Sequence, residues 1–362
     1  MVRMLVFALL FAAQPEPALE PFTARQLAPG IHLLATPPDY RGPVIGNVTV
    51  IEQSDGVVVI DSGGAAADGR RIVGFVRALT AKPIRAVVIT HWHGDHPQGV
   101  SAIRDAFPRV RIIATAATRE AIRGPAAQFL GFRPDERSDT IALNQLSGFL
   151  SGVRQASRSP EHDDATRQRY ARMMREIQAR MAEMGGTYLV LPTETFDREL
   201  LLDDRERPVR LMFLGRANTN GDAIAWLPLQ RIVATGDVVV APTPFGFFSF
   251  PGDWIGVLER LKALDFALLV PGHGEPQTDS VYLDRLIGTL TDVRAQVGAL
   301  ARQGLTLEQV RERADFSAQT AIFGDTPRNR LLFDAYWLTP IVESAYKEAR
   351  GEPIVQGGDA GG

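Results

Sequence analysis

Three histidines and one aspartate lie within six consecutive positions, in the stretch His91-Trp92-His93-Gly94-Asp95-His96. The whole chain contains only 6 histidines, so half of them are gathered here. Imidazole nitrogens and a carboxylate oxygen are ligands that zinc and similar divalent ions prefer. An apolar run at residues 86–89 precedes the cluster, and along an extended chain His91 and His93 lie on one side. The spacing therefore predicts a metal site at the end of a strand.

The elements around this cluster alternate between strands and helices. Apolar runs bounded by turn residues predict strands at 31–35, 48–51, 57–60, 84–89 and 110–114. Apolar residues spaced by three and four predict a helix over 69–80. Pro97 is suited to the first turn of a second helix, over 98–107. This alternation favours a layered domain whose strand ends carry the functional side chains.

The pattern His-x-His-x-Asp-His after a strand resembles the signature of the metallo-β-lactamase superfamily. Other parts of the family pattern are matched by Asp61, by Thr235-Gly236-Asp237 and by Gly272-His273. One position differs, because Asn218 stands where the family turn carries the third histidine of its first metal site. The resemblance implies an α+β fold, the αββα four-layer sandwich of two mixed sheets, and a centre for one or two zinc ions. The implied ligands are His91, His93 and Asn218 at the first site, Asp95, His96 and His273 at the second, favoured site, and Asp237 between them.

The implied activity is hydrolysis, in which a metal-bound hydroxide oriented by Asp95, the candidate catalytic residue, attacks an acyl substrate. A β-lactam, a lactone, a thioester or an ester would be such a substrate. Tyr40 is a candidate substrate contact, because the corresponding loop of the family lies over the metal site. Phe245 and Phe247 lie in an apolar segment that is suited equally to a substrate pocket, a core plug or a dimer contact. The alternative function is a metal-binding protein that has lost turnover through Asn218.

The rest of the chain divides into segments flanking this domain. Residues 1–20 contain a short apolar run, which predicts a signal peptide and a periplasmic or secreted protein, although a buried N-terminal segment would look similar. The metallo-β-lactamase-like domain spans 21–277, with an insertion at about 124–186 that contains one long polar helix and is suited to act as a lid. Strands resume near 188–191. Residues 278–350 are predicted to form a C-terminal helical region and 351–362 a flexible tail.

Composition narrows the function further. The chain has 362 residues, a net charge of -3 and no block of basic residues, which argues against nucleic acid as a partner. It contains no cysteine, so disulfides and thiolate ligands are excluded. The expected partner is a small-molecule substrate, with no stable membrane insertion, and the oligomeric state stays open. His32 is expected to be a structural or exposed residue rather than a ligand. His162 is expected at the solvated start of a helix, the alternative being that it reaches the site from the insertion.

Overall fold

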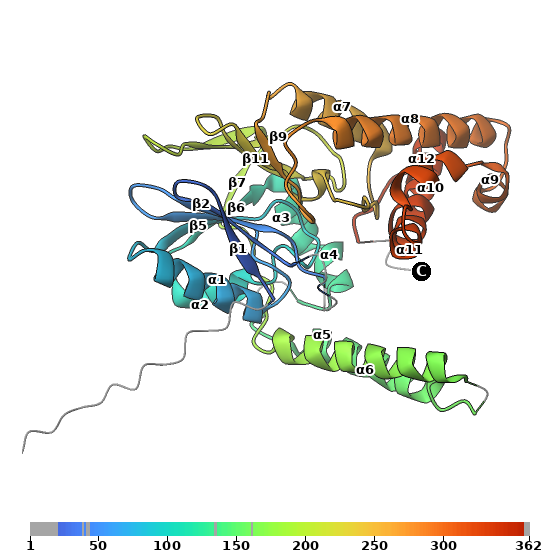
Figure 1. Ribbon diagram of the computed structural model, residues 1–362, viewed down its shortest axis with the longest axis horizontal. Coiled ribbons are helices and arrows are strands. Elements are labelled where there is room, and N and C mark those ends of the chain that lie inside the picture. The colour runs from blue at the N-terminus through green and yellow to red at the C-terminus, as the bar shows by residue number, and fades with distance from the viewer. Residues whose placement is uncertain (1–20, 38–39, 41–43, 134–135, 161, 358–362) are drawn as a thin grey trace, which may run out of the picture.

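The computed structural model describes residues 21–37, 40, 44–133, 136–160 and 162–357. Two mixed sheets lie at its centre, and helices cover their outer faces (Figure 1). This architecture confirms the predicted four-layer sandwich and the C-terminal helical region. The predicted signal peptide, residues 1–20, lies outside the described residues.

The first sheet has seven strands in sequential order. Its pairs are antiparallel from β1 to β4 and parallel from β4 to β7. Strand β1 was not predicted from the sequence. The strand predicted near 188–191 was wrong, because these residues form no ladder and β7 begins only at Glu194. The strands are β1 (Thr23–Ala28), β2 (Ile31–Ala35), β3 (Val48–Glu52), β4 (Val57–Ile60), β5 (Ile84–Val88), β6 (Arg111–Thr115) and β7 (Glu194–Phe196).

The second sheet has the strand order β12-β11-β10-β9-β8. Its pairs are antiparallel except for the parallel pair of β11 and β12. The parallel pair brings the ends of these two strands to one edge, where Asp237 and His273 follow them. The strands are β8 (Glu199–Leu202), β9 (Val209–Phe213), β10 (Ala223–Leu227), β11 (Ile232–Ala234) and β12 (Leu268–Val270).

Strand β4 shows why the core of the molecule has two sides. Its four residues are all buried, and successive side chains of a strand point to opposite faces. Val57 and Val59 pack among the helices outside the first sheet, whereas Val58 and Ile60 pack between the two sheets. A continuous apolar run is therefore the expected sequence for a strand that is covered on both faces.

The loop at residues 91–96, here called the metal loop, follows β5. Three helices next to the first sheet follow β4, β5 and β6: α1 (Ala66–Leu79), α2 (Val100–Ala106) and α3 (Ala116–Arg123). Helix α1 buries Ile72 and Val76, as its apolar spacing predicted. The predicted position of Pro97 was wrong, because residues 94–99 form turns and α2 begins only at Val100. Those turns are the segment that places Asp95 and His96.

The C-terminal helices cover the outer face of the second sheet. Trp254, Leu290 and Trp337 are fully buried in the core that they share with this sheet. The helix predicted near 328–350 consists of two α-helices joined by a π-helical turn. The segments are α7 (Pro251–Lys262), α8 (Val281–Arg302), α9 (Leu307–Arg313), α10 (Ser317–Phe323), α11 (Pro327–Phe333), η2 (Asp334–Leu338) and α12 (Thr339–Arg350).

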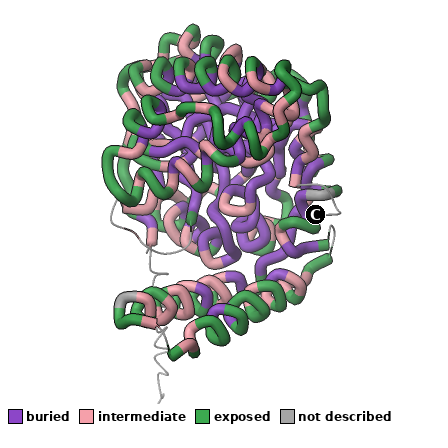
Figure 2. The backbone as a smooth tube through the Cα atoms, turned by 90° about the vertical axis from the view of Figure 1, so that its right-hand side faces the viewer, coloured by how far each residue is buried: buried purple, intermediate pink, exposed green. Residues whose placement is uncertain are grey.

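The insertion contains the short helix α4 (Pro125–Phe129) and a hairpin of two long helices, α5 (Thr140–Ala156) and α6 (Asp164–Met184), of which only α6 was predicted. Most of the hairpin is exposed or half-buried (Figure 2), and its small apolar contact includes Leu150, Val153 and Ile177. Its base is joined to α1 by the Arg71–Glu183 ion pair at 3.2 Å. The remainder extends away from the body of the molecule, so it does not fold over the metal loop as a lid.

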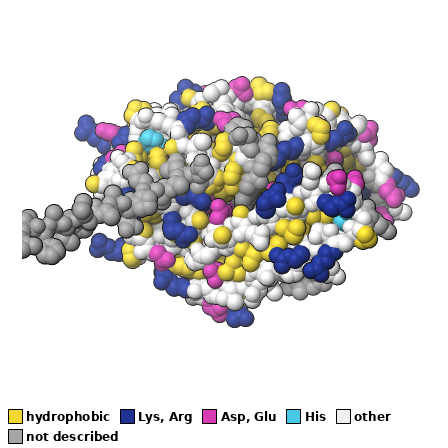
Figure 3. Space-filling view, turned by 60° about the horizontal axis from the view of Figure 1, so that its bottom comes forward, with side chains coloured by type: hydrophobic (Ala, Val, Ile, Leu, Met, Phe, Trp, Pro, Cys, Tyr) yellow, Lys and Arg dark blue, Asp and Glu magenta, His cyan; other side chains and the backbone are white. Residues whose placement is uncertain are grey.

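The surface agrees with the balanced composition. Basic and acidic side chains are interspersed among apolar ones on the face shown in Figure 3, which carries no field of a single sign. Within the described residues, the structure contains no helix that combines the length and the apolar character needed to cross a membrane.

Candidate metal centre

The loop that leaves β5 brings His91 and His93 together. The Nε2 atom of His91 lies 3.0 Å from the Nδ1 atom of His93, and both rings are buried. The hydroxyl of Thr90 lies 3.0 Å from Nδ1 of His91 and fixes its ring from behind. Both histidines therefore direct one nitrogen toward the same region, as the alternation along an extended chain predicted.

Asp61 orients the third histidine of the loop. Its carboxylate lies 2.8 Å from Nδ1 of His96 and also accepts hydrogen bonds of 2.8 Å from the backbone N–H and the hydroxyl of Thr90. The bond to Nδ1 leaves Nε2 of His96 facing the metal group, as in the carboxylate–histidine pairs of known metal sites. Asp61 adopts a left-handed backbone conformation, with φ of 61°, which aspartate tolerates better than most residues.

Asp95, His96 and His273 form one group of three candidate ligands, with ligand atoms within 4.8 Å of one another. The Oδ2 atom of Asp95 lies 2.9 Å from Nε2 of His273 and 3.6 Å from Nε2 of His96. His273 follows β12, so this group depends on the second sheet meeting the first. The structure thus brings together the three residues that the sequence assigned to the second metal site.

Asp237 lies between the two predicted sites. Its Oδ2 atom is 3.5 Å from Nε2 of His91, and its Oδ1 atom is 3.2 Å from Nε2 of His96 and 3.5 Å from Nε2 of His273. It lies in the short helix η1 (Gly236–Val238) after β11. A Cβ atom at Gly272 would lie only 2.0 Å from Oδ1 of Asp237, so this position requires glycine. Asp237 has the location expected of a bridging ligand.

Asn218 is buried in the turn between β9 and β10. Its Nδ2 atom donates a 2.7 Å hydrogen bond to the carbonyl of Phe245, whereas its Oδ1 atom is buried without a hydrogen-bond partner in the described structure. The turn itself is held by Asp222, which accepts bonds from the backbone N–H and hydroxyl of Thr219. Asn218 therefore has a structural bond on one side of its amide and a free acceptor on the other.

The charges of the group are strongly coupled. Burial lowers the pKa of His93 to about 3, with His91 adding to this effect, so His93 is neutral. Burial alone would raise the pKa of Asp95, but His96 and His273 hold it below its ordinary value. Burial lowers the pKa of His96, but the carboxylates of Asp237, Asp95 and Asp61 raise it by more, so the pKa lies above its ordinary value. Ionised carboxylates among imidazoles are a donor set suited to a divalent cation.

Unsatisfied buried atoms provide an independent test of whether a metal fits. Buried polar atoms normally have hydrogen-bond partners, and exceptions call for an explanation such as an ion. Among the candidate ligand atoms, His96 Nε2 and Asp237 Oδ1 form no hydrogen bond in the described structure, although they lie only 3.2 Å apart. The residues present therefore fit a divalent metal, with His91, His96 and Asp237 as one group of candidate ligands and Asp95, His96 and His273 as another.

The three predicted substrate contacts do not share one cavity. Tyr40 and His273 both line a cavity of about 930 Å³, together with residues of α8 and α11. Phe245 and Phe247 do not line it; the ring of Phe245 lies 5.2 Å from that of His93 and 5.2 Å from that of Phe247. The structure does not bring Tyr40 together with the two phenylalanines. His162 bonds the carbonyl of Ala156 within the helical hairpin, and His32 lies in β2, so both remain outside the group.

One residue that contacts Trp92, Gln356, was not predicted from the sequence to have a role. It lies in the segment predicted to be a flexible tail, yet its side chain is buried and accepts a 2.9 Å hydrogen bond from Nε1 of Trp92. The prediction of a flexible tail is therefore wrong at Gln356, whereas residues 351–353 are exposed and 358–362 lie outside the described residues. No local pattern signals this contact, because it joins residues 264 positions apart.

Comparison with known proteins agrees with this geometry. A model of the metallo-β-lactamase superfamily matches residues 41–273, which include strands β3 to β12 and every candidate ligand. The chain belongs to the metallo-β-lactamase superfamily. The membership confirms the predicted family and supports a divalent metal centre.

Similar proteins include enzymes that act on sulfate esters. A linear primary-alkylsulfatase from a Pseudomonas species is 25% identical over 300 residues, covering 77% of this chain and 51% of the relative. Among solved structures, a stereoselective inverting sec-alkylsulfatase from Pseudomonas sp. has a TM-score of 0.58 and 17% identity over 90% of this chain and 50% of its own. A metallo-β-lactamase from Pontibacter korlensis has a TM-score of 0.51 and 16% identity over 75% and 99%, respectively. The chain spans about half the length of the alkylsulfatases that it matches.

Proposed function

We propose that this protein is a metal-dependent hydrolase that cleaves the sulfate ester of an apolar alcohol, with zinc as its metal. The observation that carries this proposal is the cavity that opens onto His273, taken together with the similarity to a linear primary-alkylsulfatase. Membership of the metallo-β-lactamase superfamily supports the class, a hydrolase. The choice of ester rests on the size and lining of the cavity and on the similarity to the alkylsulfatase.

The cavity has room for an apolar chain. Its volume, about 930 Å³, lies at the upper end of the range typical of small-molecule sites. Three apolar side chains that line it are unusually exposed for their type: Val44 at 68%, Val281 at 51% and Ile322 at 46%. Covering such side chains with an alkyl chain gains roughly 0.8 kcal/mol per buried CH₂ group. The cavity wall therefore favours a substrate whose apolar part is long.

The same cavity contains groups that suit an anionic ester. Arg285 of α8 and Arg328 of α11 line it, and a guanidinium is well matched to the oxygens of a sulfate or phosphate. Glu275, Asp279 and Asp325 also line it, so the charge is mixed rather than uniformly basic. We place the ester group next to His273 and the alkyl chain along the C-terminal helices.

Each residue of the centre has a proposed task. His91, His93, Asp95, His96, Asp237 and His273 hold the metal, and Asp61 and Thr90 keep two of the histidine rings in place. When bound, zinc supplies Lewis-acid activation of water and of the bond under attack. The carboxylate of Asp95, which is ionised and partly exposed, orients the attacking water through Oδ2. His91, His93 and His96 are buried, so water and substrate reach the group from the side of His273.

A series of linear alkyl sulfates tests the proposal. Purified, zinc-loaded protein is incubated with sulfates of increasing chain length, and released inorganic sulfate is measured. We expect kcat/KM to rise with chain length until the cavity is filled. Failure to release sulfate from every member of the series, by protein whose zinc content is confirmed, would refute the proposed substrate.

Two neighbouring substitutions separate the cavity from general surface effects. Ile322→Arg places a charge in the cavity wall, whereas Leu331→Arg places one on a side chain that is 67% exposed and does not line the cavity. We expect Ile322→Arg to raise KM for long-chain sulfates by about tenfold, since a few CH₂ contacts are each worth about 0.8 kcal/mol. Leu331→Arg should leave KM unchanged. Equal effects of the two substitutions on KM would show that the cavity wall at Ile322 does not contact the alkyl chain.

The acyl substrates expected from the sequence form the second candidate. The aromatic wall of Phe245 and Phe247 beside His93 is the observation that favours them, because it would contact an apolar acyl group. The same zinc-loaded protein is therefore tested with a β-lactam, a lactone, a thioester and an ester. Turnover of one of these, without release of sulfate from the alkyl series, would establish the acyl class. Full zinc content without any turnover would instead support a non-catalytic metal-binding protein.

Export to the periplasm or medium also remains a proposal. It rests on the apolar run within residues 1–20 alone. Mass spectrometry of the protein recovered from its natural host gives the test, and we expect the N-terminal residues to be missing. Recovery of a cytoplasmic chain that still begins with Met1 would contradict export.

A further inference from the structure

Gln356 joins three loops that are far apart in the sequence. Its Oε1 atom accepts hydrogen bonds from Nε1 of Trp92 at 2.9 Å and from the backbone N–H of Asn220 at 3.4 Å. Its Nε2 atom donates to the carbonyl of Phe248 at 2.9 Å. The side chain is only 6% exposed, so these bonds are formed away from solvent. The oxygen and the nitrogen of this one amide group therefore both form hydrogen bonds.

Each of the three loops carries part of the proposed centre. Trp92 lies between His91 and His93 in the chain, Asn220 is two residues after Asn218, and Phe248 belongs to the segment that contains Phe245. A second bond, from Asn218 to the carbonyl of Phe245, joins the last two loops directly. Gln356, which comes from the C-terminal segment, therefore connects three loops through Trp92, Asn220 and Phe248.

Trp92 is the most direct of these connections. Its indole is fully buried, and its Nε1 atom donates a hydrogen bond to Gln356. The ring also packs against Phe129 and Phe248, with centroids 5.9 Å away in each case. Because the backbone of Trp92 is continuous with both neighbouring histidines, a fixed indole limits the movement of their rings.

We propose that Gln356 is a positioning residue for the metal centre, which acts by holding the indole of Trp92 and thereby the spacing of His91 and His93. A buried donor that loses its acceptor is destabilising, so without Gln356 the indole N–H would have to find another partner. Movement of the indole transmits to the two histidines. The C-terminal segment is then part of the metal centre rather than an appendage.

The inference rests on the proposed metal centre, and zinc affinity is the measurement that tests it. Zinc binding by metal-free Gln356→Ala is measured in competition with a chromophoric chelator. We expect affinity to fall by about tenfold, the lower end of the range for outer partners of metal ligands. Gln319→Ala is the matched control, because Gln319 is also buried in the C-terminal region and donates one hydrogen bond, to Asp292. It should leave zinc affinity unchanged, even where thermal stability falls.

A double-mutant cycle with Trp92→Phe identifies the path. Phenylalanine retains a buried ring but lacks the N–H that bonds Gln356, so the two substitutions remove the same contact from its two ends. If Gln356 acts through Trp92, the combined loss of zinc affinity will be smaller than the product of the separate losses. Independent losses, or unchanged affinity in Gln356→Ala, would overturn the proposal. Failure of the wild-type protein to bind zinc would instead reject the metal centre itself.

Discussion

The two halves of the metal centre differ in how completely they are built. Around His96 and His273, two imidazoles and the carboxylate of Asp95 converge, and Asp61 holds the ring of His96 through Nδ1. Around His91 and His93, the position that would complete the site is Asn218, and half of its amide is already used to hold Phe245. At the second site, Asp95, His96 and His273 all offer ligand atoms to a metal. At the first site, Asn218 also forms a hydrogen bond to Phe245.

The turn that carries Asn218 therefore has two roles: it holds the segment of Phe245, and it offers an acceptor to the first metal site. An imidazole at position 218 would offer a stronger zinc ligand, whereas an amide offers a donor and an acceptor at once. The Nδ2 atom binds the aromatic segment, and the free Oδ1 atom remains available to a cation. We therefore expect one tightly bound zinc ion, near Asp95, His96 and His273, and a weaker one near His91 and His93. Calorimetric titration of metal-free protein would show two equal affinities if this contrast is wrong.

The largest effect should follow loss of a ligand from the complete half. His273→Ala removes one of its three ligands while leaving both sheets intact. We expect the tight zinc affinity to fall more than about 100-fold, because loss of an outer partner of a ligand alone costs 10–100-fold. The affinity is read by chelator competition, and an unchanged value would exclude His273 from the site.

The next effect concerns the residue behind His96. Asp61→Asn keeps a side chain that tolerates the left-handed backbone at this position, but it removes the carboxylate that fixes Nδ1 of His96. Zinc affinity in the tight site should fall by about 10–100-fold. Chelator competition measures the change, and circular dichroism shows whether the fold is retained. A folded variant with wild-type affinity would show that Asp61 only holds Thr90.

The incomplete half can be changed in the opposite direction. Asn218→His restores an imidazole, so the weaker zinc ion should bind more tightly, as measured by calorimetric titration. Asn218→Ala is the control, since both variants lose the bond to Phe245 but only one gains a ligand. If the two variants bind the second zinc equally, position 218 does not contact the metal.

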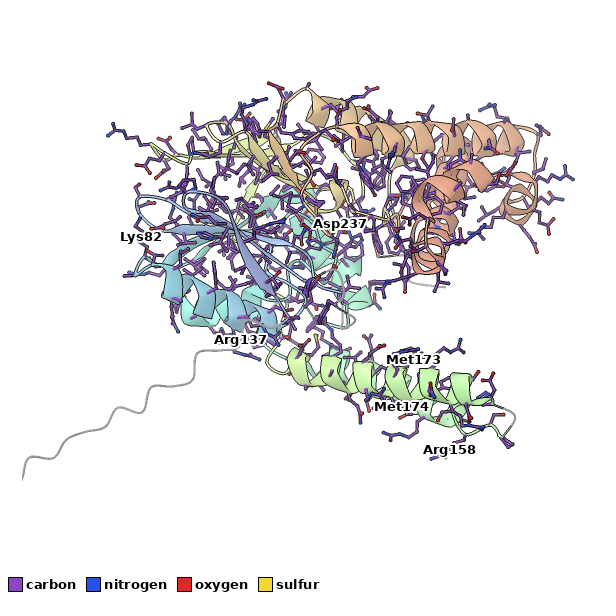
Figure 4. The ribbon with its side chains drawn as sticks, viewed as in Figure 1. Lys82, Arg137, Arg158, Met173, Met174 and Asp237 are labelled. Carbon is purple, nitrogen blue, oxygen red and sulfur yellow. The ribbon has the colours of Figure 1, made fainter. Side chains whose placement is uncertain are left out.

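The smallest effect is expected in the helical hairpin. His162→Ala removes a histidine whose Nε2 atom bonds the carbonyl of Ala156, in a region that extends away from Asp237 (Figure 4, where Met173 and Met174 mark the hairpin). Zinc affinity and turnover should be unchanged, and the free energy of unfolding should change by no more than about 0.5 kcal/mol. A clear loss of zinc would place the hairpin tip at the centre after all.

The chain of amino acids was sufficient to predict the family, the sandwich and the residues that gather around Asp237. These inferences succeeded because the information is local: buried strands are continuous apolar runs, and His91, Asp95 and His96 occur within one short loop. The insertion was predicted less well. Helix α5 was missed because it contains Gly148 and Gly152 and little charge pattern, and tertiary packing against α6 determines its conformation.

Other features depended on contacts between distant segments. The parallel pairing of β11 and β12 decides that His273 meets Asp95, and no residue near either one specifies that meeting. The C-terminal helices turn an edge of the sandwich into a cavity beside His273. Gln356 lies in a glycine-rich segment whose composition indicates disorder, yet burial of one amide with three hydrogen-bonding partners makes it part of the centre. Such contacts stabilise a segment only once the rest of the chain has assembled, so local sequence cannot reveal them.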